Sequence, residues 1–246
     1  MEINIGKKLK HLSLNMFKKI LFSLTAIAIV FSIYLIFFIA PVPINPMDAG
    51  GDPLNFKIFY FHVPIAVTAY LAFAIVFVSS IMYLRTKRET WDTRAVAASE
   101  IGVILAVLTL ITGSLWAKSA WGEFWVTWDV RLNTSLVLFL IYLSYLMVRK
   151  SVDEPEKRAR LSAVFGIVGF IGVPLSFLSI RLWNRATVHP VVVGPGGGGI
   201  SGDTVIGTVL VNVIAFILLL VSLIILRMEN EKLAEEIAFI KRTKNL

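Results

Sequence analysis

Six uncharged apolar stretches leave this chain few ways to fold. They are separated by shorter segments that carry most of the charges, and they comprise residues 20–40, 58–84, 101–117, 132–148, 161–180 and 204–226. Each stretch is at least 17 residues long, and a helix of roughly 17 to 25 apolar residues crosses the hydrocarbon core of a bilayer. The sequence therefore predicts an all-α integral membrane protein with six transmembrane helices.

The composition agrees with this prediction and excludes several other classes of protein. Hydrophobic residues make up 57% of the chain, charged residues 16%, and the mean hydropathy is +0.79, which does not fit a water-soluble globular domain. The chain has no cysteine, so it offers no disulfide, thiolate metal site or cysteine nucleophile. The net charge is +8, but no nucleic-acid-binding motif accompanies it, and we expect no nucleic-acid partner.

The positive charges predict how the chain is oriented in the membrane. Of the 24 Lys and Arg residues, 19 lie at the two termini or in the loops on the same side as the termini, and 5 lie on the opposite side. By the positive-inside rule both termini are cytoplasmic, and the loops 41–57, 118–131 and 181–203 face outward.

Three regions follow from this topology. Residues 1–19 alternate Lys clusters with apolar residues, and we expect a basic amphipathic segment that lies against anionic membrane lipids. Residues 20–226 form the six-helix domain. Residues 227–246 are predicted to be a cytoplasmic helical tail, because apolar residues recur there at helical spacing among Glu and Lys.

Tryptophan gathers on the predicted outer side. Five of the six tryptophans lie there, with Trp91 alone inside, and they are Trp116, Trp121, Trp125, Trp128 and Trp183. In a helical loop Trp121, Trp125 and Trp128 would stand at positions i, i+4 and i+7 and share one face. The cluster fits either an anchoring girdle at the membrane interface or a flat apolar platform for a cofactor.

Two of the three histidines, His62 and His189, are predicted to lie at the same depth as this loop. Each fits a boundary residue, but two neutral imidazoles also suit the axial positions of a haem iron. Cations would then neutralise the haem propionates, and the candidates are Lys118, Arg131, Arg181 and Arg185. Asp129 follows the tryptophans, and its carboxylate could be a solvated loop charge, could orient an indole N–H or could contact a partner's cation.

These residues resemble a known family. The pattern consists of His62-Val-Pro at a helix start, Gly113-Ser-Leu-Trp leading to Trp121-Gly, Trp128-Asp before Arg131-Leu, and Trp183-Asn before His189. It is similar to the cytochrome c maturation protein C family, whose tryptophan-rich signature is termed WWD. The resemblance covers nearly the whole chain, with the WWD loop at 116–131.

The resemblance implies a haem-binding and haem-transfer subunit rather than an enzyme. It implies that haem b is held non-covalently and transiently at the outer face of the plasma membrane and is then loaded onto a haem chaperone. It also implies a complex with the ATPase and membrane subunits of an ABC transporter and a small single-span accessory protein. In such proteins His62 and His189 would bind the haem iron, and the tryptophan loop, Asp129, Arg131 and Trp183 would contact the macrocycle.

The sequence departs from the family pattern within the loop. Members usually have Trp-x-Trp-Asp, whereas two residues separate Trp125 from Trp128 here. In a helix the additional residue would rotate Trp128 by about 100°. Asn133 stands where the family commonly has Thr, and the path from Trp183 to His189 is about two residues longer than in familiar members.

Three other functions remain open from the residues. A cytochrome c synthetase (haem lyase) component would act directly on apocytochrome c. An electron-transfer subunit usually needs histidines deep inside helices, and no histidine here lies deep in a span. A transporter could carry haem through its own bundle.

Two features inside the spans also carry predictions. Glu100 lies near the inner end of the third stretch and is either an Arg-paired interfacial residue or the mark of an inner haem entry route. Pro174 and the glycines at 166, 169 and 172 favour a kink and close packing in the fifth span.

Overall fold

The computed structural model describes residues 2–42, 52–191 and 202–243. Every regular element within these residues is helical. The elements are α1 (Glu2–Tyr34), the π-helical η1 (Leu35–Ile39), η2 (Pro53–Phe56), α3 (Lys57–Thr86), α4 (Glu89–Trp121), α5 (Val130–Ser151), α6 (Pro155–Gly169), α7 (Gly172–Leu182), η3 (Asn184–Ala186) and α8 (Asp203–Thr243).

Six helical segments of the described residues are long and apolar enough to cross a membrane, which confirms the predicted six-helix membrane fold. They comprise Asn15–Ile39, Leu54–Thr86, Glu89–Trp121, Val130–Ser151, Pro155–Leu182 and Asp203–Ala234. The first span joins α1 to η1, and the fifth joins α6 to α7. Several helices extend past the uncharged stretches, because backbone hydrogen bonding continues into the charged flanks.

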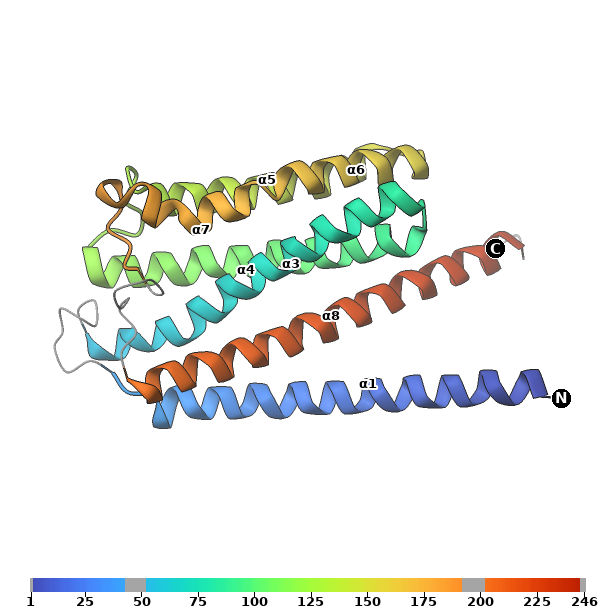
Figure 1. The fold of residues 1–246 in the computed structure, drawn as a ribbon, viewed down its shortest axis with the longest axis horizontal. Helices are drawn as coiled ribbons and strands as arrows, with labels where there is room; N and C mark the ends of the chain where they lie inside the picture. Colours follow the sequence, from blue (N-terminus) through green and yellow to red (C-terminus); the bar gives the residue numbers. More distant parts are fainter. Residues whose placement is uncertain (1, 43–51, 192–201, 244–246) are drawn as a thin grey trace.

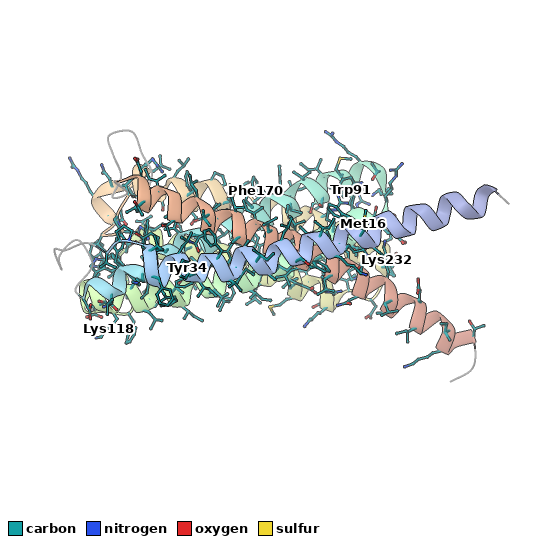
Figure 2. All side chains as sticks on the ribbon, turned by 90° about the horizontal axis from the view of Figure 1, so that it is seen from below. Met16, Tyr34, Trp91, Lys118, Phe170 and Lys232 are labelled. Carbon is teal, nitrogen blue, oxygen red and sulfur yellow. The ribbon has the colours of Figure 1, made fainter. Side chains whose placement is uncertain are left out.

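The helices lie side by side in one elongated bundle, and Figure 1 shows both chain ends at the same end of it. The ends of α1 and α8 project beyond the other helices past Met16 and Lys232 (Figure 2). Residues 2–19 belong to α1, which runs without a break into the first span. Their contact with membrane lipids, the division of the chain at residues 19 and 226, and the cytoplasmic side of the termini stay predictions.

The fifth span is broken where the sequence places its glycines and proline. α6 ends at Gly169 and α7 begins at Gly172, with Pro174 in its first turn, where a missing backbone N–H costs little. A Cβ on Gly169 would lie 2.8 Å from Cγ2 of Ile141. The break therefore coincides with the close approach of this span to α5.

Ion pairs tie the helices together at the terminal end of the bundle. Arg227 of α8 donates to both carboxylate oxygens of Glu100 of α4, at 2.6 and 3.2 Å. Glu100 is thus an Arg-paired residue, in line with the first of its two interpretations. Arg149 of α5 makes a similar two-pronged contact with Asp92 of α4, at 2.7 and 2.9 Å. The pocket described below lies at the opposite end of the bundle.

Candidate functional site

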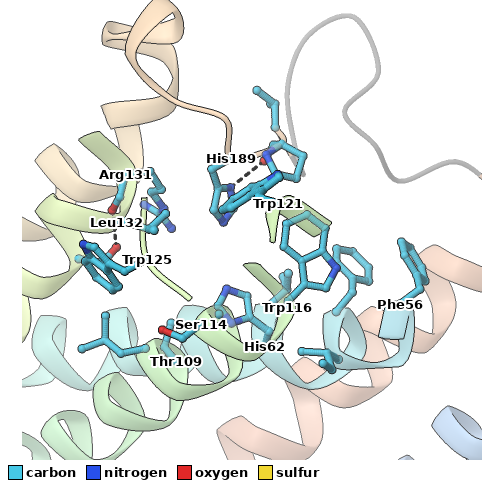
Figure 3. Close-up of a pocket in the computed structure, with 18 residues that line it drawn as sticks. Phe56, His62, Thr109, Ser114, Trp116, Trp121, Trp125, Arg131, Leu132 and His189 are labelled. Atoms are coloured by element: carbon cyan, nitrogen blue, oxygen red, sulfur yellow. Dashed lines mark hydrogen bonds between the residues drawn. The ribbon is translucent and has the colours of Figure 1, made fainter. Parts of the chain in front are cut away.

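A pocket opens at the end of the bundle opposite the termini, between the start of α3, the end of α4, the start of α5 and the segment 187–191 (Figure 3). The empty space in and in front of the pocket is about 1050 Å³, a volume that includes open solvent. The structure brings six of the predicted site residues to its wall, and they are His62, Trp116, Trp121, Trp125, Arg131 and His189. Phe56, Phe59 and Val63 make much of the remaining wall apolar.

Trp128 and Trp183 do not line this pocket. Their side chains are 59% and 44% exposed, at the start of α5 and the end of α7. For Trp128 the reason lies in Gly122, which takes a left-handed conformation with φ of 79° and ends α4 directly after Trp121. The helical loop that would place three indoles on one face is therefore absent, and Trp121 packs edge-on against Trp116 instead, with ring centroids 5.2 Å apart. The glycine following Trp121 is a sequence signal that could have indicated this helix end.

His62 stands in the second turn of α3 and rests against α4. Its Nδ1 lies 2.9 Å from Oγ1 of Thr112. That hydroxyl donates its own proton to the carbonyl of Leu108 at 2.7 Å, so it accepts from the imidazole. Nδ1 of His62 is therefore the protonated nitrogen, and the lone pair of Nε2 is left free.

His189 follows η3 in the irregular segment 187–191. Its Nδ1 lies 3.0 Å from the backbone carbonyl of Pro190, which only accepts, so Nδ1 again carries the proton and Nε2 keeps its lone pair. Burial, assisted by the positive charge of Arg131, lowers the pKa of His189 to about 4. The imidazole is consequently neutral and able to bind a metal at ordinary pH.

The two imidazoles reach into the same pocket from different elements (Figure 3), with ring centroids 6.4 Å apart and planes at 38°. Both present an unprotonated Nε2, and each is oriented by a hydrogen bond at Nδ1, as ligating histidines commonly are. Within the described parts of the chain, no group of three or more His, Cys, Asp or Glu side chains is placed to hold a metal ion. The two imidazoles supply two ligands, a number that suits a metal bringing its remaining ligands with it.

Four cations were predicted to meet the haem propionates, and of these only Arg131 is among the residues that line the described pocket. Its guanidinium donates to the backbone carbonyl of Ser176 and lies 5.8 Å from the ring centroid of Tyr70. Lys118 turns back to the carbonyl of Gly122 at 2.7 Å, Arg181 lies over the ring of Phe177, and Arg185 is exposed. Arg131 is thus the cation placed to meet an anionic group in the pocket.

Asp129 makes other contacts than those the sequence suggested. Its side chain is fully buried, not solvated, and its bonds lie within the chain rather than to an indole. Oδ1 accepts from the backbone N–H of Leu132 and caps α5, at 2.9 Å. Oδ2 accepts from Oγ1 of Thr187 and the N–H of Val188, at 2.8 and 2.7 Å. A carboxylate so occupied is not available to a partner's cation, and it joins the start of α5 to the segment that carries His189.

The fold and the pocket define a class: a polytopic helical membrane protein with two imidazoles facing each other in an aromatic pocket near one end.

The family model described as heme exporter protein C matches residues 4–243. Heme exporter protein C of Bradyrhizobium diazoefficiens is 37% identical over 181 residues, which are 74% of this chain and 68% of that protein. Heme exporter protein C of Paracoccus denitrificans is 29% identical over 71% of this chain and 72% of that protein. A putative cytochrome c biosynthesis ccmC-like mitochondrial protein of Marchantia polymorpha is 36% identical over 68% of this chain and 64% of its own length. The chain belongs to the heme exporter protein C family.

Proposed function

We propose that this protein binds haem in the pocket between α3, α4, α5 and residues 187–191 and delivers it to a haem chaperone during cytochrome c biogenesis. Membership of the heme exporter protein C family supports a role in haem export and delivery, as a transport component rather than an enzyme. The haem is cargo, held transiently and released to the next protein.

The relationship between His62 and His189 carries this proposal. When two imidazoles bind one metal from opposite sides, each metal–nitrogen bond is about 2 Å long and each ring centroid lies about 1 Å beyond its nitrogen. The two ring centroids are then roughly 6 Å apart. The observed separation is 6.4 Å. A porphyrin supplies the four equatorial ligands, which explains how two side chains suffice.

The rest of the pocket fits the remaining chemistry of haem. Trp116, Trp121 and Trp125 offer flat apolar surfaces to the macrocycle, and the guanidinium of Arg131 suits a propionate carboxylate. The chain has no cysteine, so it cannot form a thioether with haem, in keeping with haem b held without a covalent bond. Three further residues remain candidate haem contacts on the basis of the sequence, although their side chains are not among those that line the described pocket. They are Trp128, Asp129 and Trp183.

The orientation and the partners belong to the same proposal. The excess of Lys and Arg at the terminal end favours the cytoplasmic side for that end, so the pocket faces the extracytoplasmic side of the inner membrane. There it is accessible to a chaperone. We infer an assembly with the ATPase and membrane subunits of an ABC transporter and a small single-span protein, because this chain carries no phosphate-binding loop of its own in the sequence.

Absorption spectroscopy of the purified, haem-loaded protein tests the haem site. We expect a bis-histidine spectrum that His62→Ala and His189→Ala each alter, while His11→Ala leaves it unchanged. His11 is the matched control, since it is the third histidine and belongs to the N-terminal part of α1, outside the residues that line the pocket. Unaltered spectra in both pocket variants would reject the ligand assignment.

Delivery is tested separately from binding. Haem-loaded protein mixed with the chaperone should pass haem to it. Formation of holocytochrome from apocytochrome c and haem in the absence of the chaperone would instead favour the synthetase alternative.

A further inference from the structure

The protein holds its two candidate haem ligands in different ways. His62 belongs to the continuous helix α3, and α4 supports its ring directly. Thr112 fixes Nδ1 at 2.9 Å, and the ring edge lies against Gly113, where a Cβ would be only 3.0 Å from Cε1. The neighbouring helix α4 therefore supports this imidazole at two points.

His189 has no such support from a helix. It lies in the irregular segment 187–191, and its Nδ1 bonds to the carbonyl of the next residue, Pro190. Its backbone N–H donates to Oγ1 of Thr187 at 3.1 Å. Thr187 and Val188 donate in turn to Oδ2 of Asp129. Among the hydrogen bonds described for residues 187–189, those that reach the rest of the protein all end on this carboxylate oxygen.

We propose that His62 is the fixed haem ligand and His189 the displaceable one, and that Asp129 and Thr187 form a latch that sets how readily His189 leaves. The inference rests on the proposed haem-binding function and deepens it. During handover the bond between iron and Nε2 of His189 breaks, and a donor atom of the receiving protein takes the vacated axial position. His62 remains bound and keeps the haem in the pocket until the new bond has formed.

Asp129 suits the part of a latch because it is anchored on its other side. Oδ1 caps α5 through Leu132, and the buried carboxylate accepts three hydrogen bonds in all, from Leu132, Thr187 and Val188. Bonds to an ionised acceptor are stronger than those between neutral groups, yet breaking two of them frees the segment without disturbing a helix core. Asp129 and Thr187 are positioning residues in this scheme, and neither needs to touch haem.

Carbon monoxide binding to the ferrous, haem-loaded protein measures the displacement. A haem with two imidazole ligands binds carbon monoxide only after one imidazole leaves, so the binding rate at saturating gas reports the departure of the weaker ligand. We expect Asp129→Asn and Thr187→Val to raise this rate by about tenfold, as the loss of hydrogen bonds to the latch implies. Thr187→Ser keeps the hydroxyl and should restore the wild-type rate.

A matched control separates the latch from helix capping in general. Asp52 also caps a helix, accepting from the N–H of Leu54 at 2.9 Å, and this hydrogen bond does not involve residues 187–191. Asp52→Asn should leave the rate unchanged. Resonance Raman spectra identify the ligand that stays: the wild-type carbon monoxide adduct should match the adduct of His189→Ala and differ from that of His62→Ala.

The outcomes divide clearly. Rates that do not respond to Asp129→Asn and Thr187→Val, or an adduct that matches His62→Ala, would overturn the inference even if haem is bound by both histidines. A wild-type protein without a bis-histidine spectrum would overturn the proposed haem site, and this inference with it.

Discussion

Gly113 of α4 and His62 of α3 are in such close contact that a Cβ on the glycine would lie 3.0 Å from Cε1 of the imidazole. The contact holds the ring between Thr112 on one side and the open pocket on the other. The glycine leaves room here for a side chain of the neighbouring helix.

Gly113→Ala should therefore push His62 out of line with His189. We expect a several-fold lower haem affinity, because the added methyl group would overpack a helix contact. Titration of the apoprotein with haem measures the change. Gly207→Ala is the control, since a Cβ there would meet no atom within 4 Å, and an equal loss in both variants would argue against the contact.

Protonation of His189 should make the stability of the apoprotein depend on pH. Burial and Arg131 lower the pKa of His189 from 6.5 to about 4, so the unfolded chain is protonated in a range where the folded protein is not. Stability should fall as the pH drops from about 6.5 to about 4, by roughly 1 to 3 kcal/mol, and level off below. Thermal unfolding of the wild type and of His189→Gln measures it, and an identical pH dependence in the two proteins would contradict the burial of a neutral imidazole.

The pair of Asp92 and Arg149 should contribute to stability. The side chains are only 17% and 14% exposed, and they stand in the first turn of α4 and the last turn of α5, where helix dipoles favour their charges. Asp92→Asn leaves the guanidinium poorly compensated and should lower the free energy of unfolding by about 3 kcal/mol. Thermal unfolding in detergent tests this against Glu89→Gln, an exposed acidic residue of the same helical turn, which should have little effect.

The tryptophans should not contribute equally to haem binding. Trp121 lines the pocket and packs edge-on against Trp116, whereas Trp128 is 59% exposed and lies outside the pocket lining. We expect Trp121→Ala to reduce haem occupancy more than Trp128→Ala does, measured on protein purified from equal amounts of membrane. The reverse order would show that the loop 122–129 rearranges when haem binds.

The orientation is open to a chemical test, because the chain has no cysteine of its own. Glu123 lies in the exposed loop after α4, and Asp153 lies in the loop between α5 and α6 at the other end of the bundle. A cysteine in place of Glu123 should react with a membrane-impermeant maleimide in intact cells, and one in place of Asp153 only after permeabilisation. The opposite pattern would place the pocket on the cytoplasmic side.

Much of the fold could be predicted from the sequence, because the bilayer imposes a simple rule on the chain. Every backbone polar group in hydrocarbon must be hydrogen-bonded within the segment, so an apolar stretch of sufficient length becomes a helix whatever its neighbours are. The break at Gly169 and Gly172 could be predicted for a similar local reason, since these residues and Pro174 weaken the helix where they stand.

The candidate site was predictable only in its ingredients. Histidine, tryptophan and arginine at one depth indicated a haem pocket, and six of those residues do meet there. The sequence placed Trp128 on the same face as Trp121 and Trp125 only if the loop were helical, and Gly122 ends the helix directly after Trp121. The role of Asp129 was also missed, since its bonds to Thr187 and Val188 join segments that no local pattern connects.

The sequence by itself determined the class of protein, the six membrane-spanning segments and the residue types available for binding, since hydrophobicity and helix formation depend on consecutive residues. Only the tertiary structure decided that Nε2 of His62 and Nε2 of His189 are the free nitrogens, that Arg131 is the cation in the pocket and that Asp129 holds the His189 segment. Those relationships depend on how α3, α4 and α5 pack against one another, and side-chain contacts between helices are set by the whole bundle.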